Sequence, residues 1–215
     1  MSTDITLYGD RFWISPYVYS CFVALREKEL AFDVSEIALD KKEQHHPEYR
    51  DRTITAKVPA LRHGDFWLAE SSAIIEYLEE AFPAPKHRAL LPTGVRERAR
   101  ARQIISWLRS DLLVLREERP TTTMFYQRAS RPLSEAGQTA ADKLLRAANL
   151  LIAEGATALF GGFSIADADL AFMLQRLALN GHPVPDKVRA FVNAQWARPS
   201  VRAFVERVRP AYEHY

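Results

Sequence analysis

Two serines at the starts of helical patterns are the side chains of this chain best placed for chemistry. Ser15 precedes Pro16 and follows the strand-like run Ile5–Tyr8, and Ser71 follows Glu70 directly after another extended run. A helix start presents backbone N–H groups without helical partners and the positive end of the helix dipole, which together favour an anion. Each serine is therefore suited to act on a negatively charged ligand. The alternative in both cases is an ordinary helix cap.

Pro59 marks a third position of interest, because it enters a strand-like run directly after Lys57 and Val58. Proline lacks a backbone N–H, so it belongs at a sheet edge or in a special turn. An edge-strand role accounts for Val58-Pro59 taken alone. The pair stands shortly before Glu70-Ser71, on a hairpin that leads into a helix, and this combination is more specific than either part.

A further helix start lies in the second half of the chain, at Phe163-Ser164-Ile165-Ala166-Asp167. Its spacing is that of a capping box, with Asp167 reaching back to the N–H of Ser164 in place of the usual glutamate. We assign this motif to folding and not to catalysis.

The composition excludes several classes of protein. Of the 215 residues 47% are hydrophobic and 26% charged, and the net charge is +2, so neither disorder nor nucleic-acid binding is expected. Cys21 is the one cysteine and the histidines lack ligand spacing, so we expect neither a redox disulfide nor a metal site. The N-terminal residues lack a signal-peptide pattern, and no run reaches the ~18 apolar residues of a membrane span. A cytoplasmic protein without membrane contact is expected.

The elements that must position these residues fall into two groups. Residues 1–82 read as βαβ, an irregular stretch with room for a helix, and ββα, which predicts an α+β domain with a small mixed sheet. Residues 83–92 are proline-rich and read as a linker. Residues 93–215 show only helical patterns and predict an all-helical domain. The expected elements are strands at Ile5–Tyr8, Ala31–Ile37, Val58–Arg62 and Phe66–Leu68, the turn His63-Gly64-Asp65, and helices at Ser15–Lys28, Ser71–Ala81, Val95–Glu118, Ser134–Glu154 (stopped by Gly155), Ile165–Asn180, Asp186–Ala197 and Val201–Arg209.

Together these motifs resemble the cytosolic glutathione transferases, in which a thioredoxin-like domain precedes an all-helical one. The resemblance covers nearly the whole chain, and it is closest to the bacterial YfcF-type branch in the first half and over Arg96–Pro120. It implies that the Val58-Pro59 bond is cis and that the valine backbone pairs with the cysteinyl part of glutathione. It also implies that Ser71 holds the γ-glutamyl carboxylate, with Glu70 near the ligand amino group.

The glycine carboxylate of glutathione needs a cation, and Lys57 is the candidate that the motif places best. Alternatives lie in the irregular segment, at Lys41, Lys42, His45 and His46. This region departs from the family, because Thr53-Ile54-Thr55-Ala56-Lys57 replaces the usual Asn-Pro-x-Gly run before Val-Pro.

The resemblance gives Ser15 a chemical role, because the tip of this helix is where redox relatives carry a reactive thiol. Ser15 would donate its hydroxyl to the thiolate of glutathione without becoming a nucleophile. A free thiol has a pKa near ~8.5, and lowering it by about two units requires about 2.7 kcal/mol. One hydrogen bond to a charged atom supplies ~1.5–3 kcal/mol and a helix start ~0.3–1 kcal/mol, so no general base is needed.

Two other residues compete for this role. Tyr8 is the rival hydroxyl, because some classes of the family use a tyrosine at the end of the first strand, although a tyrosine in a buried strand is more often part of the core. The Ser-Pro helix start resembles the serine-using classes and favours Ser15. Cys21 falls within the helix near Val18 and Phe22, so we expect a buried, inert thiol and no glutathione-dependent thiol transfer by the protein itself.

The resemblance implies a glutathione S-transferase, with glutathione as co-substrate and no tightly bound cofactor. The second substrate would be a small hydrophobic electrophile or a peroxide, in a pocket with Arg116, Phe125 and Tyr126; Arg109 and Met124 are further candidates. A homodimer is expected from the family. The alternatives are a non-catalytic binding or regulatory module with the same fold, and a glutathione-dependent isomerase or dehalogenase.

Overall fold

The structure, a computed structural model, describes residues 4–212, which form two compact units. One unit contains the residues up to Leu90 together with those from Ala203 onward, and the other is Leu91–Arg202. The first unit holds a four-stranded mixed sheet and the second is helical, which confirms the predicted fold class. This division differs from the predicted domain boundaries because the residues from Ala203 onward group with the first unit.

The sheet of the first unit has the strand order β2-β1-β3-β4. Its strands are β1 (Ile5–Asp10), β2 (Asp33–Ile37), β3 (Ala60–His63) and β4 (Phe66–Ala69). β1 pairs with β2 in parallel, whereas the β1–β3 and β3–β4 pairs are antiparallel. The predicted βαβ unit and hairpin are therefore confirmed, with Gly64 at φ 60° in the hairpin turn.

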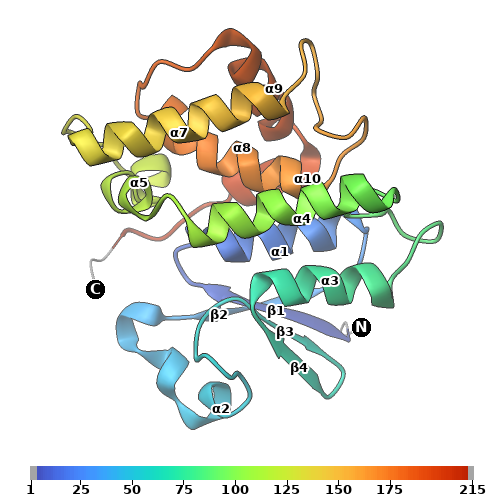
Figure 1. The fold of residues 1–215 in the computed structure, drawn as a ribbon. Coiled ribbons are helices and arrows are strands. Elements are labelled where there is room, and N and C mark those ends of the chain that lie inside the picture. Colours follow the sequence, from blue (N-terminus) through green and yellow to red (C-terminus); the bar gives the residue numbers. More distant parts are fainter. Residues whose placement is uncertain (1–3, 213–215) are drawn as a thin grey trace. The chain divides into compact units, whose positions relative to one another are not determined.

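Helices α1 (Pro16–Glu27) and α3 (Ser71–Ala81) lie on one face of the sheet and the short α2 (Pro47–Arg50) on the other (Figure 1). β1 and α1 approach each other closely, because a Cβ added at Gly9 would stand 2.8 Å from Cγ1 of Val18. Leu7 faces the same side as Gly9 and is fully buried, as are Ile74 and Leu78 of α3. This layer forms the core of the unit and fixes the start of α1 against the end of β1.

The irregular stretch after β2 contains two 3-10 turns, η1 (Leu39–Lys41) and η2 (Glu43–His45), followed by α2. Tyr49 of α2 is buried in a cluster with Ile37 and Ala60, and Tyr8, Leu39, Val58 and Trp67 pack against this cluster. The stretch with room for a helix thus covers the face of the sheet opposite α1.

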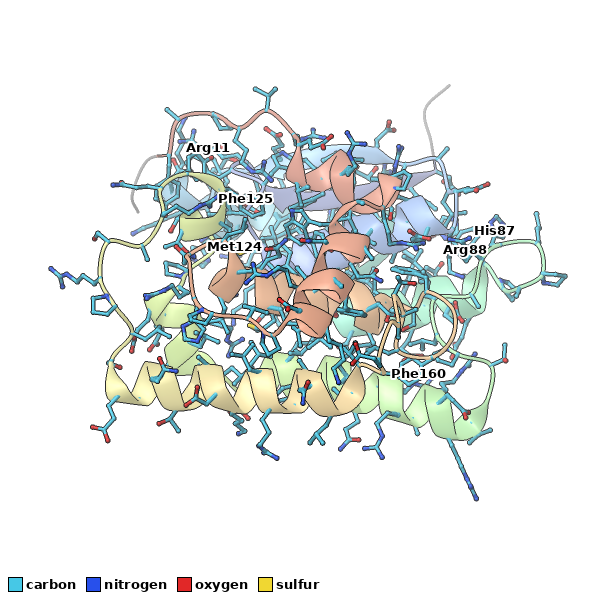
Figure 2. All side chains as sticks on the ribbon, turned by 90° about the horizontal axis from the view of Figure 1, so that it is seen from above. Arg11, His87, Arg88, Met124, Phe125 and Phe160 are labelled. Atoms are coloured by element: carbon cyan, nitrogen blue, oxygen red, sulfur yellow. The ribbon has the colours of Figure 1, made fainter. Side chains whose placement is uncertain are left out.

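The predicted linker is bonded to the first unit through a buried lysine at the end of α1. Nζ of Lys28 donates to the carbonyls of Phe82 (2.8 Å) and Arg88 (3.0 Å) and pairs with Glu79 at 2.9 Å. Arg88, shown beside His87 in Figure 2, pairs with Glu27 at 2.6 Å. Residues up to Leu90 are therefore part of the folded unit.

The second unit is built around α8 (Ile165–Ala178), whose residues are almost all buried. α4 (Val95–Ser110), α6 (Thr122–Phe125), α7 (Glu135–Leu151) and α9 (Asp186–Trp196) pack against it, and α5 (Leu113–Glu118) packs against α7. The predicted capping box is confirmed, because the Ser164 side chain accepts the backbone N–H of Asp167 and the Asp167 carboxylate accepts the backbone N–H of Ser164 at 2.7 Å. The last helix, α10 (Pro199–Val205), ends in residues that group with the first unit.

The prediction of one long helix over Val95–Glu118 was wrong. The chain is extended at Asp111 and left-handed at Leu112 (φ 61°), so α4 ends at Ser110 and α5 begins at Leu113. The Asp111 carboxylate accepts from Trp107 Nε1 (2.9 Å) and Leu112 N (2.7 Å) and pairs with Lys143. These side-chain bonds compete with the helical backbone pattern.

Two other helix ends were also predicted wrongly. α7 ends at Leu151, before the glycine at 155 that was expected to stop it. α10 ends at Val205 and not at Arg209. The guanidinium of Arg209 donates to the carbonyls of Phe204 and Val205, both at 3.0 Å, and so satisfies acceptors that a longer helix would have used.

Candidate functional site

Ser15 is the N-cap of α1, as the sequence predicts. Its backbone is extended (φ −65°, ψ 122°), and its Oγ accepts the N–H of Val18 at 3.3 Å. Pro16 occupies the first helical position, and the first turn, Pro16-Tyr17-Val18, is uncharged. A serine oxygen that accepts one hydrogen bond can still donate its own hydrogen. The cap and the chemical role considered for Ser15 are therefore compatible.

A buried aspartate that none of the sequence motifs indicated holds the backbone of this cap. Asp10, the last residue of β1, is 2% exposed; its Oδ2 accepts from Ile14 N at 2.9 Å and its Oδ1 from Ser15 N at 3.1 Å. Burial raises the pKa of the Asp10 carboxyl above its usual range, while the N–H groups of Ile14 and Ser15 and the charge of Arg209 oppose the rise. An acidic residue at a strand end just before a serine cap is the signal that could have indicated it.

The loop between Asp10 and Ser15 is tight because Trp13 adopts a left-handed backbone conformation (φ 51°). Trp13 N donates to the Asp10 carbonyl at 3.0 Å, and its indole Nε1 donates to Glu36 Oε1 at 2.6 Å. The ring is buried and packs edge-on against Phe22 at 5.8 Å between centroids. This loop therefore has one defined conformation in which the first turn of α1 is fixed to the sheet.

The start of α3 has the features expected of an anion site. Glu70 is its N-cap residue with φ 68°, and among the described residues no side chain forms the capping hydrogen bond. The first turn, Ser71-Ser72-Ala73, is uncharged, and Ser71 is buried whereas Glu70 is exposed. Cys21 is fully buried, with its Sγ 3.8 Å from the Ser71 carbonyl, which confirms the expectation of a buried thiol.

The Val58-Pro59 peptide bond is cis, as the family resemblance implies. β3 begins at Ala60, so the Val58-Pro59 pair lies just before the strand. The predicted strand, Val58–Arg62, wrongly included this pair.

The strand register brings the three motifs to one end of the sheet. Ala60 is paired with Tyr8 of β1 on one side and with Ala69 of β4 on the other. The residues that follow Tyr8 lead to Ser15, the residues before Ala60 are Val58-Pro59, and the residues after Ala69 are Glu70-Ser71. Side chains far apart in sequence are therefore carried by neighbouring strand ends.

The predicted cation Lys57 has an exposed side chain, and its carbonyl accepts the hydroxyl of Tyr49 at 2.7 Å. Burial, with a smaller effect of Tyr8, raises the pKa of that tyrosine. The alternative cations on the segment after β2 are exposed as well: Lys41, Lys42, His45 and His46.

Tyr8 packs in the core cluster on the face of the sheet opposite α1. Its ring lies 4.7 Å from that of Trp67 and 5.8 Å from that of Tyr49, centroid to centroid. Gly9, the next residue, faces Val18 of α1, so the strand alternation directs Tyr8 away from that helix. This is the core role considered for Tyr8 in the sequence.

The residues predicted for an electrophile pocket lie in the second unit. Arg116 of α5 donates to the carbonyl of Arg109 at 3.2 Å, and Arg109 pairs with Asp169 at 2.7 Å. Phe125 of α6, labelled beside Met124 in Figure 2, faces Phe172 of α8 at 6.1 Å. Tyr126 follows directly as the last residue of that turn, and its N–H donates to the carbonyl of Thr122 at 2.9 Å. The pocket itself stays a prediction.

Within residues 4–212 the structure contains no group of three histidine, cysteine or acidic side chains that could hold a metal ion. None of the helices in this range has the length and apolar character needed to cross a bilayer.

Sequence comparison identifies two matching domain families. The family profile described as glutathione S-transferase, N-terminal domain, matches residues 7–86, and the C-terminal domain profile matches residues 94–208. Among curated proteins, the probable maleylacetoacetate isomerase 2 of Drosophila melanogaster is 39% identical over 106 residues, which cover 48% of this chain and 45% of that protein. The chain thus spans about half the length of the curated relatives it matches.

Solved structures match over a longer range. A glutathione transferase homologue from Burkholderia gl. BGR1, with bound glutathione, is 43% identical with a TM-score of 0.79, covering 94% of this chain and 96% of that one. A maleylacetoacetate isomerase from Methylobacterium extorquens AM1, with bound malonate and glutathione, is 25% identical with a TM-score of 0.72, covering 93% and 95%. These similarities do not distinguish the YfcF-type branch from others.

Proposed function

Since the chain belongs to the glutathione S-transferase family, we propose that it binds reduced glutathione and transfers the glutathione thiolate to small hydrophobic electrophiles. Reduction of organic peroxides is a second reaction of the same thiolate. Glutathione is a co-substrate in this proposal, and no other cofactor takes part.

The observation that carries the proposal is the meeting of three strand ends around Ala60. A tripeptide with an anionic γ-glutamyl end and a central thiol requires an anion site and a polarising group a short distance apart. The start of α3 at Ser71 suits the carboxylate, and the start of α1 at Ser15 suits the sulfur. Val58 lies between the two and offers its backbone to the cysteinyl part, with Lys57 as the proposed partner of the glycine carboxylate.

In the proposed mechanism the thiol proton is released to solvent and the Ser15 hydroxyl donates to the remaining thiolate. The first turn of α1 contains no acidic residue, so the positive end of the helix dipole adds to this hydrogen bond, while the Asp10 carboxylate bonds the backbone just before that turn, at Ile14 and Ser15. The sulfur then attacks the electrophilic carbon, a C–S bond forms, and the leaving group departs with its electron pair. Ser15 keeps its proton throughout. In the proposal, Arg116, Phe125 and Tyr126 contact the electrophile.

A glutathione-dependent isomerase is the second candidate, and the names of relatives favour it. Relatives from Drosophila melanogaster and Vibrio cholerae are described as probable maleylacetoacetate isomerases, and the similar structure from Methylobacterium extorquens is described as a maleylacetoacetate isomerase. In this reaction the thiolate adds to a conjugated double bond, rotation follows, and the thiolate leaves again unchanged. The same Ser15 and Ser71 geometry serves both reactions.

Calorimetry with reduced glutathione, followed by turnover assays, tests these proposals. We expect saturable binding, then conjugation of a chromogenic aryl halide. Isomerisation of maleylacetoacetate without net consumption of glutathione would favour the second candidate. Saturable binding with neither turnover would favour the non-catalytic module, and no binding at millimolar glutathione would refute the proposal.

We also propose that the protein is a cytoplasmic homodimer, as is usual in its family. Light scattering coupled to size-exclusion chromatography tests the dimer, since a mass near that of the single chain, 24.5 kDa, would contradict it.

A further inference from the structure

The residues after α10 form a segment, 206–212, that contacts the loop carrying Ser15. Nε and Nη2 of Arg209 both donate to the carbonyl of Trp13, at 3.2 Å and 3.1 Å. The same guanidinium donates to the carbonyls of Phe204 and Val205, and to that of Arg207 at 2.9 Å. One side chain thus joins the end of α10 to a loop 196 residues earlier in the chain.

Other contacts of this C-terminal segment fall on the same loop. The guanidinium of Arg207 lies 3.8 Å from the centroid of the Trp13 ring, and the ring of Tyr212 meets that of Phe12 edge-on at 5.2 Å. Phe204, at the end of α10 and just before this segment, also packs against Trp13, at 5.6 Å between centroids. Arg11, at the start of the loop and labelled in Figure 2, is held separately by Asp40 at 2.8 Å.

The carbonyl that Arg209 bonds belongs to Trp13, whose backbone has the unfavourable positive φ of this loop. Trp13 has a φ of 51°, which is unusual for a bulky residue and persists only where the surroundings enforce it. Ile14 and Ser15 follow directly, and both donate their N–H to the carboxylate of Asp10. The turn that ends in the Ser15 cap is therefore held by two sets of bonds: Arg209 bonds the carbonyl of Trp13, and the Asp10 carboxylate bonds the N–H groups of Ile14 and Ser15.

We propose that Arg209 is a positioning residue for Ser15, which acts through the Trp13 carbonyl and does not touch glutathione. This inference rests on the proposed function, in which Ser15 donates to the thiolate. Loss of Arg209 should weaken the hydrogen bond to sulfur, because the loop backbone is less firmly held. Binding of glutathione should change little, since the proposed carboxylate site at Ser71 is on a different segment.

Arg209→Gln and the control Val208→Gln separate this role from a general effect on the C-terminal segment. Val208 is 93% exposed and stands beside Arg209, so its substitution changes the same segment without removing these bonds. In Arg209→Gln we expect the pKa of the bound glutathione thiol, read from the ultraviolet absorbance of the thiolate, to rise by about one unit. This shift corresponds to about tenfold less thiolate at a pH well below that pKa. Measured at a pH well below the bound thiol pKa, where ionisation of the thiol does not contribute to binding, the Kd for glutathione from calorimetry should stay within about twofold. Val208→Gln should match the wild type in both.

A second measurement does not depend on glutathione. Hydrogen exchange of the Ile14 and Ser15 amides should be about tenfold faster in Arg209→Gln than in wild type or Val208→Gln, because these amides belong to the supported turn. If wild-type protein binds no glutathione, the proposed function fails, and this exchange experiment still decides whether Arg209 supports the loop.

Two results would overturn the inference. One is unchanged exchange at Ile14 and Ser15 in folded Arg209→Gln. The other is an unchanged thiol pKa in that variant while Ser15→Ala raises it. If Arg209→Gln does not fold, Arg209→Lys replaces it; lysine keeps the charge, but the three donors on its single nitrogen cannot reproduce the five bonds that three guanidinium nitrogens make here. A wild-type thiol pKa and wild-type exchange in that variant would equally refute the role.

Discussion

The carboxylate of Asp10 accepts the backbone N–H of Ser15 at 3.1 Å, so the last residue of β1 sets the position of the first helix cap. The other carboxylate oxygen accepts Ile14 N, which means that one buried side chain satisfies two consecutive backbone donors. A strand end and a helix start are thereby joined without a regular element between them. These two bonds set the position of the Ser15 hydroxyl, which is proposed to donate to the glutathione thiolate.

Asp10→Ala should destabilise the protein by about 1.5–3 kcal/mol, because it removes the carboxylate that accepts the buried N–H of Ile14 and the half-buried N–H of Ser15. Asp10→Asn should lose less stability, since its amide oxygen can still accept one of these two N–H groups. Urea unfolding monitored by circular dichroism measures both. Asp51→Ala, at an exposed carboxylate paired with Arg50, is the matched control and should change the free energy of unfolding by less than about 0.5 kcal/mol. Equal stabilities of Asp10→Ala and the wild type would show that these bonds do not hold the loop.

Gly9→Ala should destabilise the protein by about 1–3 kcal/mol, because the added methyl group would meet Cγ1 of Val18 at 2.8 Å and push α1 away from β1. Val18 also donates its N–H to Ser15, so the thiolate chemistry should suffer as well. Thermal unfolding and the aryl halide assay measure the two effects.

Gly162→Ala is the control for this substitution, because an added Cβ there has open space within the described residues and no positive φ to oppose it. It should leave stability unchanged or slightly higher. A wild-type melting temperature in Gly9→Ala would contradict the close approach of strand and helix.

Much of the fold could be predicted from the sequence because its signals are local. Ser15-Pro16 marks the start of α1, His63-Gly64-Asp65 marks the hairpin, and Ser164 with Asp167 marks the start of α8. Each depends on residues within a few positions of one another, so periodicity and capping rules suffice.

The features that could not be predicted depend on side chains that replace or extend backbone bonding. The apolar spacing of Leu108, Leu112 and Leu115 continues through the break at Asp111, so periodicity alone gave one helix. Asp10 and Arg209 are ordinary charged residues in the sequence. Their importance comes from contacts with the Trp13–Ser15 turn that only the folded chain creates.

Asp111, at the break between α4 and α5, should make the free energy of unfolding depend on pH in the acid range. The hydrogen bond from Lys143, with those from Leu112 and Trp107, lowers the pKa of Asp111 to about 2. A folded pKa below the unfolded value means that the ionised form stabilises the fold above about pH 4, and that this contribution is lost as the pH falls towards 2. The side chain is 36% exposed, so the contribution should be under about 1 kcal/mol.

Asp111→Asn should remove that contribution and flatten the pH dependence of the unfolding free energy between about pH 4 and pH 2. Urea unfolding of wild type and variant across this window measures the difference. Parallel curves for the two proteins would show that Asp111 carries no linked proton.

In the proposed mechanism the Ser15 hydroxyl stabilises the thiolate of a bound glutathione. Titration of the ultraviolet absorbance of that thiolate against pH, in wild type, Ser15→Ala and Tyr8→Phe, measures this effect. We predict that Ser15→Ala raises the thiol pKa by roughly 1–2 units, towards the ordinary value near ~8.5, and that Tyr8→Phe leaves it unchanged. A raised pKa in Tyr8→Phe together with a wild-type pKa in Ser15→Ala would contradict the account.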